Sequence, residues 1–134
     1  MTPEQLLYSK THEWVRVETD SAGAKIAVVG ISAFATETLA DLVYINLPVV
    51  GQRVSAGEPF GEIESVKAVS DLSSPVDGEI TEVNAQIADK LETLAEDPYG
   101  AGWLIKIKIS DESGLSELLD FAAYQKQCEE EAAE

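Results

Sequence analysis

The chain has 134 residues, 45% of them hydrophobic and 25% charged, which is the size and composition of one globular domain rather than of a disordered or fibrous protein. Nine basic against 25 acidic side chains leave a net charge of −16. This charge repels nucleic-acid phosphates, anionic lipid headgroups and other copies of the chain. We therefore expect one domain over residues 1–134, a monomer that binds neither nucleic acid nor membrane.

Targeting features are lacking in the sequence. No run of about 18 apolar residues is long enough to cross a membrane, and residues 1–5 have neither the basic nor the apolar region of a signal peptide. Cys128 is the only cysteine, which excludes an internal disulfide and fits a reducing compartment. These features favour the bacterial cytoplasm, or the mitochondrial matrix if the chain is a processed eukaryotic form.

The first half of the chain reads as strands around one short helix. Residues 13–18 and 25–31 predict two strands joined by a turn. Ser32 can cap a short helix that ends near Ala40. The apolar run 42–45 that follows predicts a buried strand, which Pro48 ends.

The second half continues the β pattern and ends in a helix. Extended segments punctuated by Gly or Pro lie around residues 54, 59–64, 69–72 and 78–83, which is typical of a small β-sandwich or barrel. Residues 104–109 alternate, so their isoleucines should face inward and their lysines outward. Leucines and alanines at helical spacing over 115–122 predict a C-terminal helix, followed by an acidic tail, 127–134, that we expect to fray.

A Pro-Val-x-Gly turn occurs twice, at residues 48–51 and 75–78. The repetition suggests two related β-halves, although such turns also arise by chance in β-proteins.

Lys67 stands out at a predicted hairpin tip. Between the extended segments 60–65 and 68–72 there is room only for a tight turn at Val66 and Lys67. Tight hairpin turns favour Gly, Asn or Asp because they need positive φ, and a β-branched Val fits them poorly. Lys67 is also the one cation among six carboxylates between residues 58 and 79. A broken local rule at a loop tip indicates a functional lysine, the alternative being an ordinary solvated one.

The flanking residues narrow the function of this lysine. Residues 64–71, Glu-Ser-Val-Lys-Ala-Val-Ser-Asp, closely resemble the lipoyl-lysine segment of glycine cleavage H proteins. Biotin carriers typically place Met on both sides of the lysine, and lipoyl domains of 2-oxoacid dehydrogenases place Asp before it, whereas this chain has Val66 and Ala68. Residues 8–15 and 96–106 also resemble the opening and closing strands of the family, so the resemblance spans a core of about residues 7–126.

The resemblance implies a mainly β fold, the barrel-sandwich hybrid of lipoyl and biotinyl carriers, which is a flattened β-barrel of two β-halves, with a short helix after residue 31 and a C-terminal helix. It implies a lipoyl group in amide linkage to Lys67. It also implies a non-catalytic carrier of aminomethyl groups in glycine catabolism and one-carbon metabolism.

The resemblance also implies partners and a resting site. The partners are glycine decarboxylase with pyridoxal phosphate, a tetrahydrofolate-dependent aminomethyltransferase, the FAD enzyme dihydrolipoamide dehydrogenase, and lipoylation enzymes. By matching motifs, Glu13, Asp71 and Thr11 are candidates for a cleft that holds the loaded arm. From the residues alone, Glu13 could equally be a solvated strand residue, and Asp71 a turn or cap carboxylate.

Besides the carrier, two alternatives remain at the level of sequence. A Schiff-base enzyme would need a buried Lys67 with a lowered pKa, which the acidic, exposed tip disfavours. An acidic binding module could carry Lys67 incidentally, for example an H-like protein that relays lipoyl groups to other complexes. His12 is the only histidine, so we expect neither a catalytic dyad nor a metal site, and place it on a strand.

Overall fold

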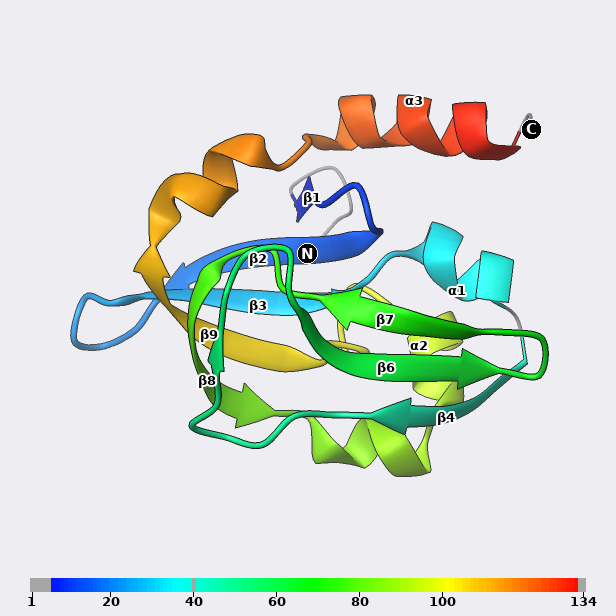
Figure 1. Cartoon of the computed structure of the whole chain (residues 1–134), viewed down its shortest axis with the longest axis horizontal. Coiled ribbons are helices and arrows are strands. Elements are labelled where there is room, and N and C mark those ends of the chain that lie inside the picture. Colours follow the sequence, from blue (N-terminus) through cyan, green and yellow to red (C-terminus); the bar gives the residue numbers. More distant parts are fainter. Residues whose placement is uncertain (1–5, 40, 133–134) are drawn as a thin grey trace.

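The computed structural model describes residues 6–39 and 41–132 and contains two β-sheets that pack face to face (Figure 1). The larger sheet has the order β1-β2-β3-β9-β8-β5. It consists of β1 (Leu7–Tyr8), β2 (Glu13–Thr19), β3 (Lys25–Ile31), β9 (Ile105–Asp111), β8 (Asp77–Val83) and β5 (Arg53–Val54). The smaller sheet has the order β4-β6-β7, with β4 (Leu42–Asn46), β6 (Pro59–Ser65) and β7 (Val69–Ser73). All pairings are antiparallel.

Short helices connect the strands or follow the last of them. They are α1 (Ala33–Leu39), the 3-10 helix η2 (Ala85–Asp89), α2 (Glu92–Glu96), the 3-10 helix η3 (Glu112–Glu117) and α3 (Phe121–Ala132). The Ser32 hydroxyl accepts the Ala35 amide at 3.2 Å, so the predicted cap of α1 is confirmed, although Ala40 lies outside the described residues. The predicted mainly β fold, with a short helix after residue 31 and a helix at the C-terminus, is therefore confirmed.

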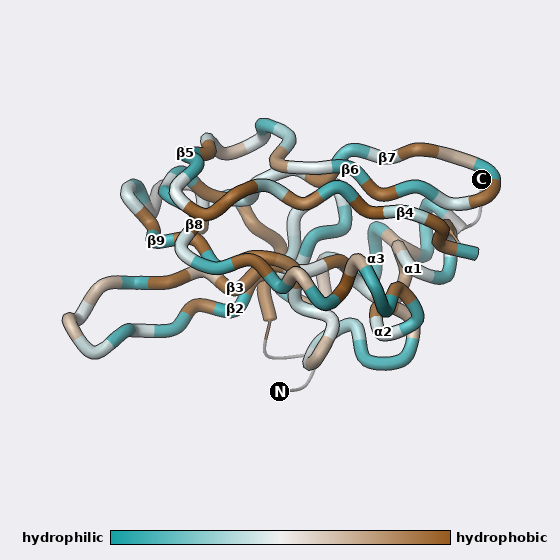
Figure 2. Tube along the Cα trace, turned by 90° about the horizontal axis from the view of Figure 1, so that it is seen from below, coloured by the Kyte–Doolittle hydropathy of each residue, from teal (hydrophilic) through white to brown (hydrophobic). Residues whose placement is uncertain are grey.

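The start of β2 and the second half of β3 are buried on both faces. Val15 pairs with Val29 on one face, and both join the main core, which also contains Ile63 of the smaller sheet. The opposite face carries Trp14 and Val28, which belong to a second apolar cluster. Because successive side chains of a strand point to opposite faces, burial of both requires a second covering element. In Figure 2 the β2–β3 and β6–β7 hairpins extend from opposite ends of this core.

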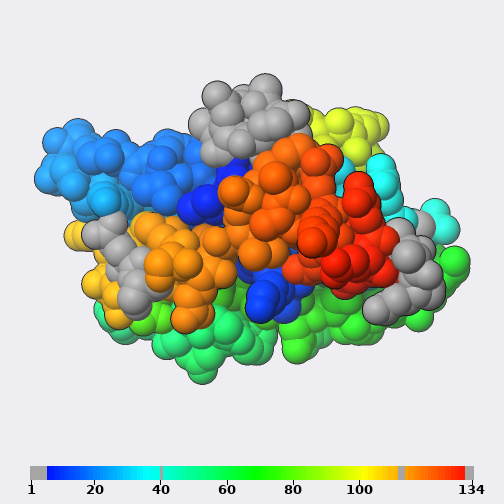
Figure 3. All heavy atoms as spheres, turned by 90° about the horizontal axis from the view of Figure 1, so that it is seen from above, coloured from blue at the N-terminus to red at the C-terminus, as the bar shows by residue number. Residues whose placement is uncertain are grey.

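The second cover is the C-terminal segment. Tyr8 and Leu119 exchange two backbone hydrogen bonds of 2.8 and 2.7 Å, which fix the chain just before α3 against β1. Tyr124 of α3 stacks on Tyr8 with ring centroids 4.3 Å apart, and both belong to the cluster that contains Trp14. Figure 3 shows α3, in red, lying beside the blue N-terminal segment on this face.

Two sequence predictions about the elements are wrong in detail. The run 42–45 is a strand, yet Val43 and Tyr44 are about half exposed, because β4 is an edge strand. Ile45 is buried in the core and Leu42 packs against it partly exposed. The C-terminal helix begins at Phe121 rather than near residue 115, and the acidic tail continues it to Ala132 instead of fraying. Only residues 133–134 of that tail lie outside the described residues.

The second half also contains α2 and η2, which the sequence patterns did not predict. The predicted alternation of β9 is confirmed, because Ile105 and Ile107 are buried and Lys108 is exposed. Among the described residues, no helix is long and apolar enough to cross a membrane.

Gly30 gives a direct test of the packing behind β3. A Cβ atom at this position would lie 2.6 Å from three atoms of the Trp14 indole, whose Nε1 donates to the Pro98 carbonyl at 2.8 Å. Since overpacking a rigid core costs about 1–3 kcal/mol, Gly30→Ala should lower the free energy of unfolding by that amount in urea titration. Ser21→Ala in the exposed β2–β3 turn is the control, and equal stability of both variants would contradict this packing.

Candidate functional site

Lys67 lies in a three-residue loop, 66–68, between β6 and β7. The backbone amides of Lys67 and Ala68 donate to the Ser65 hydroxyl at 3.2 and 3.1 Å, and the Ser65 amide donates to the Ala68 carbonyl at 2.8 Å. Of the non-glycine residues described, only His12 has positive φ. The premise that this tip forces Val66 into an unsuitable turn is therefore wrong, because Ser65 supplies the bonds that a primed turn would make.

The Lys67 side chain is exposed at this tip, and among the described residues its amine makes no hydrogen bond or ion pair. Its neighbours Val66 and Val69 are 70% and 59% exposed. The Val66 amide donates to the Asp41 carbonyl at 3.1 Å, which holds the base of the loop against the segment before β4. A free amine on a held loop is accessible to a modifying enzyme, and it lacks the burial that a Schiff-base lysine needs.

A cavity of about 500 Å³ lies beside the Lys67 hairpin. Its walls come from the turn before β2, the end of β3, α1, the β6–β7 pair and the end of α3. The lining residues are Thr11, His12, Glu13, Ile31, Phe34, Ala35, Thr38, Leu39, Ile63, Ser70, Asp71, Leu72 and Glu131. Apolar walls with a few carboxylates suit a ligand that has a hydrocarbon body and a cationic end.

Glu13 is the buried carboxylate of this cavity, with a relative exposure of 1%. Its Oε1 accepts the Ser9 hydroxyl at 2.8 Å and also the Thr11 hydroxyl, whereas its Oε2 accepts only the Ser73 amide, at 3.4 Å. Burial raises the pKa of Glu13 to about 7, and these hydrogen bonds oppose the shift without overcoming it. The alternative of a solvated strand residue is thus wrong.

The structure brings all three cleft candidates to this one cavity. Thr11 is exposed in the turn before β2 and bonds to Glu13, whereas Asp71 is an exposed residue within β7, so its interpretation as a turn or cap carboxylate is wrong. Lys67 is joined to the same wall through β7. Asp71 lies four positions after Lys67, a span of about 13 Å at the usual rise per residue of extended chain.

Several residues that line the cavity, or that bond to Glu13 from behind it, were not singled out by the sequence. Ser9 and Ser73 bond to Glu13, and Phe34 and Glu131 line the cavity from α1 and α3. Of these residues, only Ser9 could have been identified from the sequence, because it lies four residues before Glu13. His12, expected on a strand, occupies the turn before β2 with φ of 77°.

Other reactive groups lie away from the cavity. Burial raises the pKa of the Cys128 thiol, and its side chain packs against the cluster around Tyr8 and Trp14, so it is not an activated nucleophile. Within the described part of the chain, no three His, Cys, Asp or Glu side chains are grouped to hold a metal ion.

Comparison with known proteins gives a consistent result. The family model described as glycine cleavage H-protein matches residues 6–131. The glycine cleavage system H proteins of Rhodopirellula baltica and Escherichia coli are 54% and 49% identical to this chain over 129 residues, with 96% of the chain covered in each case and 96% and 97% of the relatives.

A solved structure is also similar. The crystal structure of a glycine cleavage system H protein from Mycobacterium marinum superposes with a TM-score of 0.84 at 42% identity, and the match covers 94% of this chain and 98% of that one. The predicted barrel-sandwich fold is thereby confirmed.

The burial of Glu13 should be visible in the pH dependence of stability. A carboxyl pKa of about 7 in the fold, against 4.5 in the unfolded chain, means that the folded state keeps its proton longer. Stability is therefore fullest below pH 4.5 and falls as the pH rises to about 7, by on the order of 3 kcal/mol.

Urea titrations of the wild type and Glu13→Gln across this pH range isolate the effect, because the amide removes the titration. The difference in free energy of unfolding between the two proteins should change with pH, whereas exposed Glu58→Gln should run parallel to the wild type. Parallel curves for Glu13→Gln would contradict a raised pKa.

Proposed function

We propose that Lys67 carries the lipoyl group of this chain, which belongs to the glycine cleavage H-protein family and so to the lipoyl carriers of the glycine cleavage system. The observation that carries this assignment is a free, exposed amine at the tip of the β6–β7 hairpin, whose loop is held by the Ser65 hydroxyl. Strand β7, which follows this loop, lines the cavity. Amide formation needs an unprotonated, accessible amine, and no described side chain competes for that of Lys67.

The residues around Lys67 fit a lipoyl arm. When bound, the arm supplies a dithiolane for redox and group-transfer chemistry at the end of a long hydrocarbon chain. The apolar lining of the cavity, with Phe34, Leu39 and Ile63, can cover such a chain and exclude water from it. The 66–68 loop fixes where the arm begins, since the Ser65 hydroxyl holds two of its amides.

Glu13, Asp71 and Thr11 are proposed to hold the cationic aminomethyl cargo. Glu13 Oε2 accepts one long hydrogen bond and can accept a second from the ammonium group of the cargo. The hydroxyls of Thr11 and Ser9 donate to Oε1. A cation in the cavity favours the ionised carboxylate and so lowers its pKa from about 7. Asp71 adds a second negative charge at the mouth, where solvent screens it.

We propose that the chain itself catalyses nothing and presents one arm to three enzymes. These are the pyridoxal-phosphate glycine decarboxylase, the tetrahydrofolate-dependent aminomethyltransferase and the flavin enzyme dihydrolipoamide dehydrogenase. Tethering gives the arm an effective concentration on the order of millimolar at a docked site, so weak docking suffices. The excess of acidic residues keeps the monomeric carrier apart from nucleic acids and membranes, in the cytoplasm.

Lipoylation of Lys67 can be read from intact mass. Protein made in a host that lipoylates its own carriers should be heavier by one lipoyl unit. Lys67→Arg should lack this unit because a guanidinium is not an acyl acceptor, whereas exposed Lys90→Arg should keep it. An unmodified wild-type chain from such a host would refute the assignment.

Carrier activity is tested by glycine–bicarbonate exchange with purified glycine decarboxylase. Lipoylated wild type should support exchange and Lys67→Arg should abolish it. A fully lipoylated wild type that supports no exchange would instead favour the lipoyl-relay alternative.

The role of Glu13 is measured as the lifetime of the loaded arm. A charge-assisted hydrogen bond contributes about 1.5–3 kcal/mol, so Glu13→Gln should shorten this lifetime by about tenfold or more. Glu58→Gln serves as the matched control, because Glu58 is exposed and does not line the cavity. An unchanged lifetime in Glu13→Gln would exclude Glu13 from holding the cargo.

A further inference from the structure

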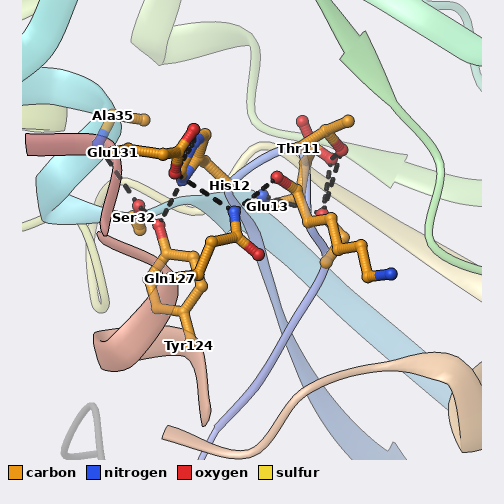
Figure 4. Close-up of polar contacts among 10 residues, drawn as sticks. Thr11, His12, Glu13, Ser32, Ala35, Tyr124, Gln127 and Glu131 are labelled. Atoms are coloured by element: carbon orange, nitrogen blue, oxygen red, sulfur yellow. Dashed lines mark hydrogen bonds and ion pairs between the residues drawn. The ribbon is translucent and has the colours of Figure 1, made fainter. Parts of the chain in front are cut away.

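Tyr124 of α3 lies where the two walls of the cavity meet, although it does not line the cavity (Figure 4). Tyr124 is only 3% exposed; its ring stacks on Tyr8, whereas its hydroxyl points into a polar junction. There the oxygen lies 2.7 Å from His12 Nδ1 and 2.5 Å from Ser32 Oγ. Burial raises the pKa of this hydroxyl, so it stays protonated.

These two partners belong to two neighbouring segments of the cavity wall, which the Ser32 amide also joins by donating to the His12 carbonyl at 2.9 Å. His12 is part of the turn that carries Thr11 and Glu13, and Ser32 caps α1 by accepting the Ala35 amide at 3.2 Å. Helix α1 then supplies Phe34 and Ala35 to the lining. One hydroxyl on the C-terminal helix therefore bonds to both the carboxylate wall and the apolar wall.

The turn needs such support, because His12 adopts a φ of 77°. Left-handed backbone costs a residue with a β-carbon about 1–2 kcal/mol and persists only when surrounding contacts hold it. Helix α3 supplies three of those contacts: Tyr124 to His12, Glu131 to His12 Nε2 at 3.3 Å, and Gln127 Nε2 to the Lys10 carbonyl at 2.9 Å.

One arrangement of protons satisfies four side chains of the junction, and the Cys128 thiol is a further hydrogen-bond neighbour of Tyr124. Ser32 donates to the Tyr124 oxygen, Tyr124 donates to His12 Nδ1, and His12 donates from Nε2 to the Glu131 carboxylate. Removal of the Tyr124 hydroxyl leaves His12 Nδ1 and Ser32 Oγ without this partner in a part-buried site, so both walls lose support together.

We propose that Tyr124 is a positioning residue that, from outside the cavity, fixes the Glu13 turn and α1 relative to one another and thereby sets how well the cavity shelters an arm attached at Lys67. This inference rests on the proposed function, since it assumes that a lipoyl group on Lys67 rests in the cavity. Its structural half concerns the unmodified chain and is tested separately.

Amide hydrogen exchange on unlipoylated protein tests the structural half. Tyr124→Phe keeps the stacked ring and removes only the hydroxyl. Exchange should accelerate by about threefold to tenfold at the Ser32 amide, which donates to the His12 carbonyl, and at Ala35, while Ile63 of β6 stays unchanged. Tyr44→Phe, on the exposed face of β4, is the matched control. Unchanged exchange at both Ser32 and Ala35 would overturn the proposal.

Shelter of the arm is measured on lipoylated protein as the rate at which a water-soluble phosphine reduces the lipoyl disulfide, far below the melting temperature. Wild type and Tyr44→Phe should react more slowly than free lipoamide, and Tyr124→Phe about threefold to tenfold faster than wild type. Ser32→Ala should produce a similar gain, and the double variant little more, because both changes break one network.

The outcomes separate this inference from the function on which it rests. If wild type is sheltered and both Tyr124→Phe and Ser32→Ala are equally sheltered, the positioning role is wrong and the carrier function stands. If lipoylated wild type reacts as fast as free lipoamide, the cavity shelters nothing, and the positioning role and the resting cleft both fail. The intact mass still decides whether Lys67 is the attachment site.

Discussion

The pairing of β2 with β3 sets the position of nearly every group discussed above. Its register aligns Glu13 with Ile31 at one end of the two strands, and the Ser32 amide then donates to the His12 carbonyl at 2.9 Å just beyond that end. The turn before β2 and helix α1 must therefore lie side by side. A shift of β2 by one residue would turn Val15 out of the main core and Trp14 into it, so burial on both faces holds this register firmly.

Burial of Glu13 is a cost that the fold bears at its cavity. A carboxyl group beside Ile31, Ile63 and Leu72 loses hydration, which raises its pKa. The hydrogen bonds from the Ser9 and Thr11 hydroxyls compensate only part of this loss, so the pKa stays at about 7. The left-handed His12 lies beside it. Strained backbone and a destabilised carboxylate at one place are typical of a site that is shaped for a ligand rather than for stability. The second apolar cluster under α3 offsets these costs with stacked and buried aromatic rings.

Local patterns predicted the strands well where one face is solvated or both faces are plainly apolar. Strand β3 begins and ends where its pattern does, and β9 alternates as its lysines and isoleucines indicate. Errors arose where the sheet edge decided the outcome. An apolar run alone cannot show that β4 has a partner on one side only. The segment before Phe121 is not a regular helix, because η3 ends at Glu117 and Leu119 then pairs with Tyr8.

The sequence by itself determined the strand pattern and the tip that carries Lys67, because periodicity and loop position are local properties of the chain. The expected reason for the tip, a turn unsuited to Val66, does not hold. The Ser65 hydroxyl closes the loop without positive φ, through hydrogen bonds that residue patterns do not reveal. Only the tertiary structure decided that Glu13 is buried, that Asp71 faces the same cavity, and that Tyr124 joins its walls. Tyr124 and its partner His12 lie 112 positions apart in the chain. The chemistry of all these groups depends on desolvation and hydrogen-bond partners that exist only after the sheets and α3 have packed together.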